Sequence, residues 1–223
     1  FDPACGCGNF LVISYRALRE LELDVLRASH ALSGHAGQQS VDVHSLIGVN
    51  VDQFYGIEIE EFPAQIAQVA LWLMDHQMNL RVSEEFGMYF ARIPLRTSPH
   101  IVNGNALRID WHDVLPAQRC SFVLGNPPFV GAKFMIEAQR DDSRAVFTGI
   151  DNAGLLDFVA AWYVKAAHYL REANPARAGQ AIWGRIPIST QSVVTDNQAV
   201  TKLGSDPELP DFAHRTNTAR CAF

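Results

Sequence analysis

The sequence predicts an α/β protein, in which a mostly parallel sheet carries helices on both faces. Three observations support this fold class. Short apolar runs at residues 55–60, 100–107 and 120–125 predict strands, and the segments 10–32, 61–79 and 155–173 have apolar residues at helical spacing. The two kinds of segment alternate along the chain, which is typical of parallel strands joined by crossover helices.

The first element is a glycine-rich loop at residues 2–9, which leads directly into the helix predicted from residue 10. Because a strand normally precedes such a loop, we expect the first strand of the sheet to be truncated. In the first helix, apolar residues at helical spacing predict the buried face: Leu11, Tyr15, Leu18, Leu21 and Leu26. In the helix at 61–79, the corresponding residues are Ile66, Val69, Ala70 and Leu73.

The segments between and after these elements have weaker patterns. Residues 33–54 are polar and rich in glycine, which predicts a loop, and residues 130–152 carry charged side chains with little periodicity, which predicts a mobile loop. A fifth strand is expected at residues 179–188. We therefore expect a catalytic core over residues 1–188. Residues 189–223 form a C-terminal segment that the sequence does not place, with the end of the catalytic domain as one alternative, and within it residues 192–211 have no predicted role.

Composition and charge restrict the class of protein. No apolar run reaches the length of about 18 residues that a membrane helix needs, so no membrane contact is expected. The net charge of −6 argues against a free-standing nucleic-acid binder. The four cysteines lack the paired spacing of a zinc site, so no metal is expected, and they are typical of buried thiols in a reducing cytoplasm.

The glycine loop predicts a cofactor site. Gly6 and Gly8 allow a ligand to approach the backbone closely, but position 11 is leucine, so the third glycine of a dinucleotide-binding loop is missing. Asp2 would repel a phosphate and suits a ligand with positive groups, such as the ammonium and sulfonium of S-adenosylmethionine. Glu58 lies at a strand end, where nucleotide-binding folds place a carboxylate against ribose hydroxyls.

A second motif, Asn126-Pro127-Pro128-Phe129, follows the strand predicted at residues 120–125. The two prolines cannot continue a central strand, and they stiffen the backbone. The Asn126 side chain and nearby carbonyl groups are then fixed acceptors for an amine, and Phe129 offers a flat ring on which a base can stack. This motif predicts the catalytic loop.

The stretches 2–22, 53–79 and 126–135 resemble the adenine-N6-specific DNA methyltransferases of γ motif order, in the MmeI-like (type IIG restriction-modification) branch. The resemblance covers about residues 1–180, and the Phe-Ala-His-Arg-Thr stretch at 212–216 is also similar to that family. It implies a Rossmann-like, S-adenosylmethionine-dependent methyltransferase fold. It also implies a bacterial, cytoplasmic enzyme that methylates a flipped adenine in DNA, with nuclease and target-recognition regions outside this chain.

The resemblance also implies the residues of the site. Asn105 would reach the adenine of the cofactor, Asn126 and the carbonyl of Pro127 would hold the target amine, and Phe129 would stack on the target base. The implied cofactor site comprises Asp2, Ala4, Gly6, Gly8, Asn9, Phe10, Glu58, Ile59, Asn105 and Ala106, and the implied catalytic loop comprises Asn126, Pro127, Pro128 and Phe129.

Three other functions stay open from the sequence. The motif Asn-Pro-Pro-Phe also serves methyltransferases that act on an RNA base or on a protein glutamine amide. A nicotinamide-dependent dehydrogenase would use a similar glycine loop, although the missing third glycine disfavours it. The third alternative is a truncated remnant that folds but does not turn over.

Overall fold

The computed structural model describes residues 1–32, 47–86, 98–150 and 153–173. The fifth strand expected at residues 179–188 and the C-terminal segment at 189–223 lie outside the described residues, so the boundary of the catalytic core at residue 188 stays a prediction. Within the described ranges, no helix combines the length and the hydropathy that crossing a membrane requires.

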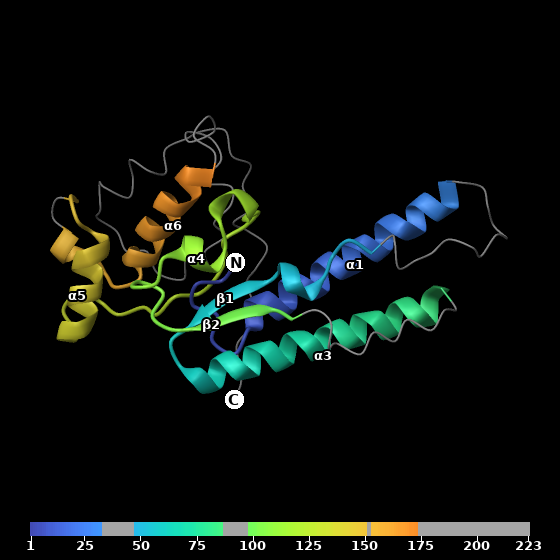
Figure 1. Cartoon of the computed structure of the whole chain (residues 1–223), viewed down its shortest axis with the longest axis horizontal. Helices are drawn as coiled ribbons and strands as arrows, with labels where there is room; N and C mark the ends of the chain where they lie inside the picture. Colours follow the sequence, from blue (N-terminus) through green and yellow to red (C-terminus); the bar gives the residue numbers. More distant parts are fainter. Residues whose placement is uncertain (33–46, 87–97, 151–152, 174–223) are drawn as a thin grey trace. The chain divides into compact units, whose positions relative to one another are not determined.

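A small parallel sheet lies at the centre of the described residues (Figure 1). Strand β1 (Tyr55–Glu58) pairs in parallel with β2 (His100–Asn103), in a register that places Tyr55 opposite His100. On the other side of β1, Asp2 forms a parallel bridge with Gly56. Residues 1–2 therefore lie in the position of a strand next to β1.

The segment 121–125 lies beside residues 1–2, at the far edge from β2. The amino group of Phe1 donates to the carbonyl of Phe122 at 2.9 Å, and the Phe1 carbonyl accepts from the Leu124 N–H at 2.9 Å. The prediction of a regular strand at residues 120–125 is wrong, because only Gly125 of this segment is a bridge residue and, among the described residues, its pairing with residues 1–2 consists of these two hydrogen bonds. The backbone is nevertheless extended here, and this pairing gives the spatial order 121–125, 1–2, β1, β2.

Helices cover both faces of this sheet. On one face, α1 (Asn9–Leu32) and α3 (Glu61–Phe86) pack side by side, and α6 (Ala160–Ala173) packs on the other face (Figure 1). Phe54 belongs to the hydrophobic cluster of α1 and α3, whereas Tyr55 and Ile57 belong to the cluster of α6. Shorter helical segments complete the described fold: η1 (Val51–Gln53), α4 (Trp111–Val114), η2 (Ala117–Arg119), α5 (Glu137–Val146) and η3 (Ala153–Leu155).

Helix α5 corrects the prediction of a loop over residues 130–152. Its sequence is mostly polar, and the residues that it buries are Asp142 and Ser143 rather than apolar side chains. Apolar periodicity therefore does not indicate this helix. The helix predicted from residue 155 begins instead at Ala160, because the chain before it is bound elsewhere: the Phe158 N–H donates to the Val130 carbonyl at 2.9 Å.

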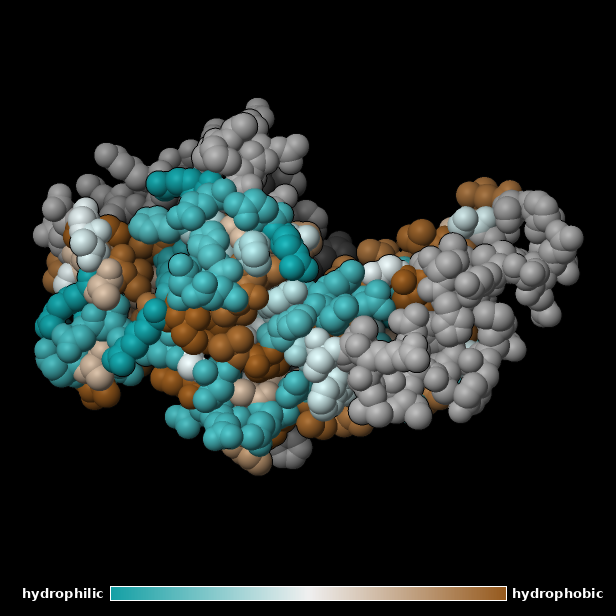
Figure 2. Space-filling view, viewed as in Figure 1, coloured by the Kyte–Doolittle hydropathy of each residue, from teal (hydrophilic) through white to brown (hydrophobic). Residues whose placement is uncertain are grey.

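The buried face of α1 differs from the predicted one. Leu18 and Leu21 are 41% and 58% exposed, and Figure 2 shows hydrophobic side chains at the surface along this helix. The residues that face α3 recur every four positions and include a buried arginine: Leu11, Tyr15, Arg19 and Leu23. The same shift occurs in α3, where Val69 and Leu73 are exposed and Leu71 is buried.

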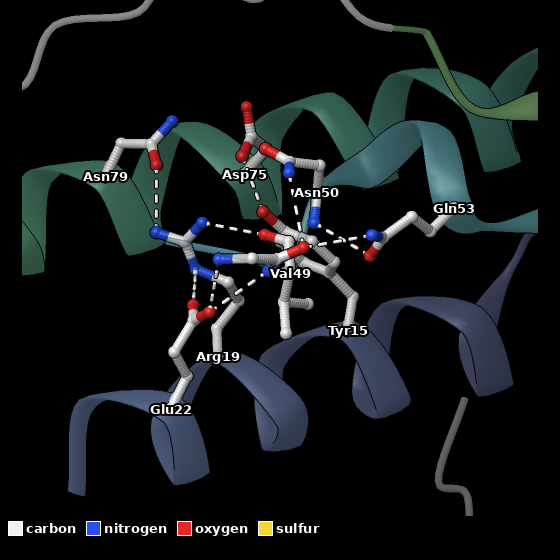
Figure 3. Close-up of polar contacts among 9 residues, drawn as sticks. Tyr15, Arg19, Glu22, Val49, Asn50, Gln53, Asp75 and Asn79 are labelled. Carbon is white, nitrogen blue, oxygen red and sulfur yellow. Dashed lines mark hydrogen bonds and ion pairs between the residues drawn. The ribbon is translucent and has the colours of Figure 1, made fainter. Parts of the chain in front are cut away.

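A buried polar network joins α1 to α3 (Figure 3). Arg19 is 1% exposed, and its guanidinium donates to the Asn79 side chain at 3.1 Å and to the Val49 carbonyl at 3.0 Å. One turn earlier, the Tyr15 hydroxyl donates to the Asp75 carboxylate at 2.5 Å. Burial raises the pKa of Tyr15 above its ordinary value. Because buried polar groups are costly when unpaired, these bonds fix the register of α1 against α3.

Candidate active site

The glycine loop connects residues 1–2 to α1 in a tight turn. The Gly8 N–H donates to the Cys5 carbonyl at 2.8 Å, and the Cys5 N–H donates to the Ile57 carbonyl of β1 at 3.1 Å. Gly6 and Gly8 have φ angles of +54° and +86°, a region that L-residues with side chains avoid. The loop is thereby bound to the carboxyl end of β1, immediately before the N-terminus of α1.

Glu58 holds this loop from the end of β1. Its carboxylate accepts from the Gly6 N–H at 2.8 Å and from the Glu60 N–H at 3.0 Å. Two oxygens of an ionised carboxylate can accept about four hydrogen bonds, so Glu58 retains capacity to accept from a ligand. The structure therefore brings together the two features that predict a cofactor site, the glycine loop and the acidic strand end.

Asp2 lies beneath the loop and is completely buried. One of its oxygens, Oδ1, accepts from the Ala4 N–H at 3.0 Å, while Oδ2 has no hydrogen-bond partner among the described residues. A Cβ on Gly125 would lie 2.5 Å from Oδ1, so only glycine allows this carboxylate to sit against the residue before Asn126. Asp2 thus lies against the glycine loop and against Gly125, the residue that precedes the predicted catalytic loop.

Burial raises the pKa of Asp2 to about 7, and the Ala4 N–H opposes that shift. Between a pH of roughly 4 and 7, the folded state then retains a proton that the unfolded state releases, so the free energy of unfolding should fall as the pH rises through this window. Asp2→Asn cannot ionise, and we expect the variant to gain on the order of 2–3 kcal/mol relative to wild type between pH 5 and pH 8.

Urea unfolding at both pH values measures this effect. Burial raises the pKa of the neighbouring Cys5 to about 12, so that thiol does not titrate in the same window. A pH dependence that is identical in wild type and Asp2→Asn would contradict the assignment to Asp2.

Asn105 and Ala106 follow β2 and contact helices from later in the sequence. The Asn105 side chain donates from Nδ2 to the Asp142 carboxylate of α5 at 2.8 Å and accepts at Oδ1 from the Leu107 N–H at 2.9 Å. Ala106 is buried, and its carbonyl accepts from Lys165 Nζ of α6 at 2.8 Å. The turn after β2 is therefore held by both α5 and α6.

The loop Asn126–Phe129 leaves the segment 121–125 at the same edge of the sheet. Pro127 is buried, whereas Asn126 is exposed and its side chain has no hydrogen-bond partner within the described part of the chain. Phe129 is 46% exposed. Just beyond the loop, the Ala132 N–H donates to the Asp157 carboxylate at 3.0 Å. The loop is thus fixed at both ends, and it presents an amide and an aromatic ring.

The sequence profile described as "MmeI, DNA-methyltransferase domain" matches residues 1–203. The chain belongs to this family. The match extends beyond residue 180, where the recognised resemblance ends, and it confirms both the expected family and the expected α/β methyltransferase fold.

Two proteins are similar to this MmeI-family domain in sequence. It is 36% identical, over its whole length, to "DNA methyltransferase A" from Bacillus subtilis (strain 168), of which it covers 24%. It is 63% identical to the type IIL restriction-modification enzyme MmeI, whose structure was solved in complex with DNA, with a TM-score of 0.71 over 77% of this chain and 22% of that one. The chain thus spans about a quarter of the length of these relatives.

In this MmeI-family domain, the described site also contains residues that the sequence analysis missed. Asp142 binds Asn105, and Lys165 donates to three carbonyls of the turn after β2, those of Ala106, Leu107 and Ile109. Burial lowers the pKa of Lys165. No local pattern marks either residue, because each contact joins segments that lie far apart in the sequence. Trp162 is buried in the core and also donates to the Pro3 carbonyl of the glycine loop at 3.2 Å.

Proposed function

We propose that this domain transfers a methyl group from S-adenosyl-L-methionine to the N6 amino group of an adenine in DNA, as part of a restriction-modification system. The observation that carries the proposal is the placement of the glycine loop, Glu58 and the Asn126–Phe129 loop at one edge of a parallel sheet. Ligands bind at the carboxyl edge of such sheets. The family and both relatives support DNA as the substrate.

The residues around Gly6 fit such a cofactor. A Cβ on Gly6 would meet no atom of the described residues within 4 Å, so these residues leave the space beside the loop open. Glu58 borders that space through its bond to the Gly6 N–H, and its remaining lone pairs suit ribose hydroxyls. The cofactor would supply the methyl group as a sulfonium substituent.

The proposed cofactor site is the set implied by the sequence: Asp2, Ala4, Gly6, Gly8, Asn9, Phe10, Glu58, Ile59, Asn105 and Ala106. Asp2 contributes through the loop that it supports, because its carboxylate is closed off from solvent. Phe10 and Ile59 are 38% and 61% exposed, which leaves their apolar surfaces accessible to an adenine ring.

The Asn126–Phe129 loop holds the target base in this proposal. An adenine amine is a poor nucleophile because its lone pair is delocalised into the ring. The Asn126 side chain and the Pro127 carbonyl would accept the two amine hydrogens, which favours a pyramidal nitrogen with its lone pair available. The prolines fix these acceptors in advance, so the protein contributes positioning and electrostatic stabilisation.

Phe129 would stack on the same base. An enzyme that modifies a base inside a duplex must flip that base out of the stack, which costs a few kcal/mol. Stacking on an aromatic ring stabilises the flipped base by roughly 1–3 kcal/mol. Phe129 is 46% exposed, which leaves much of its surface available for stacking.

Other parts of the enzyme would supply most contacts with the DNA. The net charge of −6 gives this chain little attraction for phosphates. We propose that the nuclease and target-recognition regions lie outside these residues, and that the enzyme acts in the bacterial cytoplasm, where its DNA substrate is found.

The test of the reaction is methyl transfer by the protein at its full encoded length. The enzyme is incubated with S-adenosylmethionine labelled in the methyl group and, separately, with DNA, RNA and protein substrates, and the labelled product is identified by mass spectrometry. We expect N6-methyladenine in DNA. Label found only in RNA, in protein or on cytosine would overturn the proposal.

We also expect Glu58→Ala to weaken S-adenosylmethionine binding by about tenfold or more, because hydrogen bonds to a charged group contribute about 1.5–3 kcal/mol each. Isothermal titration calorimetry measures the affinity. Glu60→Ala is the matched control, since this neighbouring carboxylate is exposed and does not contact Gly6 in the described structure. Equal affinities of wild type and Glu58→Ala would remove Glu58 from the site.

A further inference from the structure

Asp142 is a buried carboxylate that no part of the proposed reaction uses. It lies on α5, is 8% exposed, and accepts two hydrogen bonds from the turn after β2. Asn105 Nδ2 donates to its Oδ2 at 2.8 Å, and Arg108 Nε donates to its Oδ1 at 2.6 Å. Since Arg108 is mostly exposed, the partner that Asp142 holds inside the protein is Asn105.

The surroundings of Asn105 determine which way its amide points. An ionised carboxylate only accepts hydrogen bonds, so the amide atom next to Asp142 must be the nitrogen. The Leu107 N–H only donates, so the atom 2.9 Å from it must be the oxygen. These two neighbours agree, and they leave one hydrogen on Nδ2 and one lone pair on Oδ1 for a ligand.

The remaining Nδ2 hydrogen and Oδ1 lone pair of Asn105 together match one edge of an adenine. An asparagine amide recognises adenine by accepting from its 6-amino group and donating to a ring nitrogen. A 6-oxo purine, such as hypoxanthine, presents an acceptor where adenine presents a donor. With the amide held in the observed direction, its oxygen would face that acceptor and would gain no hydrogen bond.

We propose that Asp142 is a positioning residue, which fixes the Asn105 amide so that the site selects a 6-amino purine over a 6-oxo purine in the cofactor. This inference rests on the proposed function, in which Asn105 lies at the cofactor adenine. It adds a specificity role to α5, the helix that follows the Asn126–Phe129 loop in the chain.

The experiment compares two reaction-product analogues, S-adenosyl-L-homocysteine and S-inosyl-L-homocysteine, by calorimetry on the full-length protein. We expect wild type to prefer the adenosyl compound by at least about tenfold, the discrimination typical of one well-placed amide. Asp142→Asn can donate as well as accept, so it removes one of the two constraints on the direction of the Asn105 amide and leaves the Leu107 N–H as the other. We expect it to lose part of the preference, chiefly through tighter binding of the inosyl compound.

Two control variants separate this role from general disruption. Asp141→Asn changes the adjacent carboxylate on α5, which pairs with Arg144 at 2.6 Å, and should leave the preference unchanged. Arg108→Ala removes the other partner of Asp142 without releasing Asn105, and should also keep the preference. A merely structural role of Asp142 would lower both affinities together and leave their ratio as it is in wild type.

Each outcome of this experiment bears either on the role of Asp142 or on the proposed function. Retention of the wild-type preference by a folded Asp142→Asn variant would overturn the inference. If that variant does not fold, Asn105→Ala takes its place, and retention of the preference there would overturn the inference equally. A wild-type protein that binds both analogues equally would overturn the inference but leave the proposed function standing, whereas a protein that binds neither would count against the proposed function itself.

Discussion

Replacing Asn126 by alanine should lower the rate of methyl transfer by a factor of about 10²–10³ while leaving cofactor affinity unchanged. Removing one preorganised hydrogen-bonding group from an active site typically has an effect of this size. Asn126 is exposed at the site edge, and its side chain makes no hydrogen bond within the described residues, so its loss should not disturb the fold. Its proposed partner is the target amine rather than the cofactor.

Single-turnover transfer of tritiated methyl groups to DNA measures the rate, and calorimetry measures cofactor binding. Phe129→Ala should have a milder effect, since stacking contributes roughly 1–3 kcal/mol per base, and Phe129→Trp should retain activity because a flat ring remains. Near-normal turnover by Asn126→Ala would mean that the Asn126–Phe129 loop is a structural turn, and the proposed catalytic role would be wrong.

The parts of the site that could be predicted are those in which a few adjacent residues define the chemistry. Gly6 and Gly8 indicate close backbone approach whatever surrounds them, and the structure gives both glycines positive φ angles. The role of Glu58 was predicted from its place at the end of a predicted strand, and the structure places its carboxylate against the Gly6 N–H. Local sequence therefore predicted the position of the loop and of its acidic neighbour.

The parts that could not be predicted depend on tertiary partners. Arg19 is buried on α1 because Asn79 and the Val49 carbonyl accept from it, and neither lies near it in the sequence. Apolar spacing alone therefore assigned Leu18 and Leu21 to the buried face, although they are exposed. Helix α5 was missed for the same reason, because its inward-facing Asp142 is satisfied by Asn105 and Arg108.

Gly8→Ala should reduce the free energy of unfolding by about 2–6 kcal/mol, because two separate costs add. Its φ of +86° lies in the left-handed region, where a residue with a side chain is strained by about 1–3 kcal/mol. The new Cβ would also lie 2.9 Å from the Cβ of Ala67 and 3.0 Å from its Cα. Overpacking of this kind costs typically about 1–3 kcal/mol, because α1 and α3 must move apart.

Gly6→Ala is the matched control, because its φ of +54° carries a comparable strain but its Cβ would meet no atom within 4 Å in the part of the chain that the structure describes. Urea unfolding should therefore show a smaller loss for Gly6→Ala than for Gly8→Ala. Cofactor affinity should fall in Gly6→Ala even though the fold is retained, since the new methyl group enters the open space beside the loop. In Gly8→Ala, adding Ala67→Gly should recover only part of the steric loss, because the contact with the Cα of residue 67 remains and a glycine inside α3 itself costs about 0.5–1 kcal/mol. Equal destabilisation by the two alanine substitutions, with no recovery in the double variant, would show that contact with α3 does not require glycine at position 8.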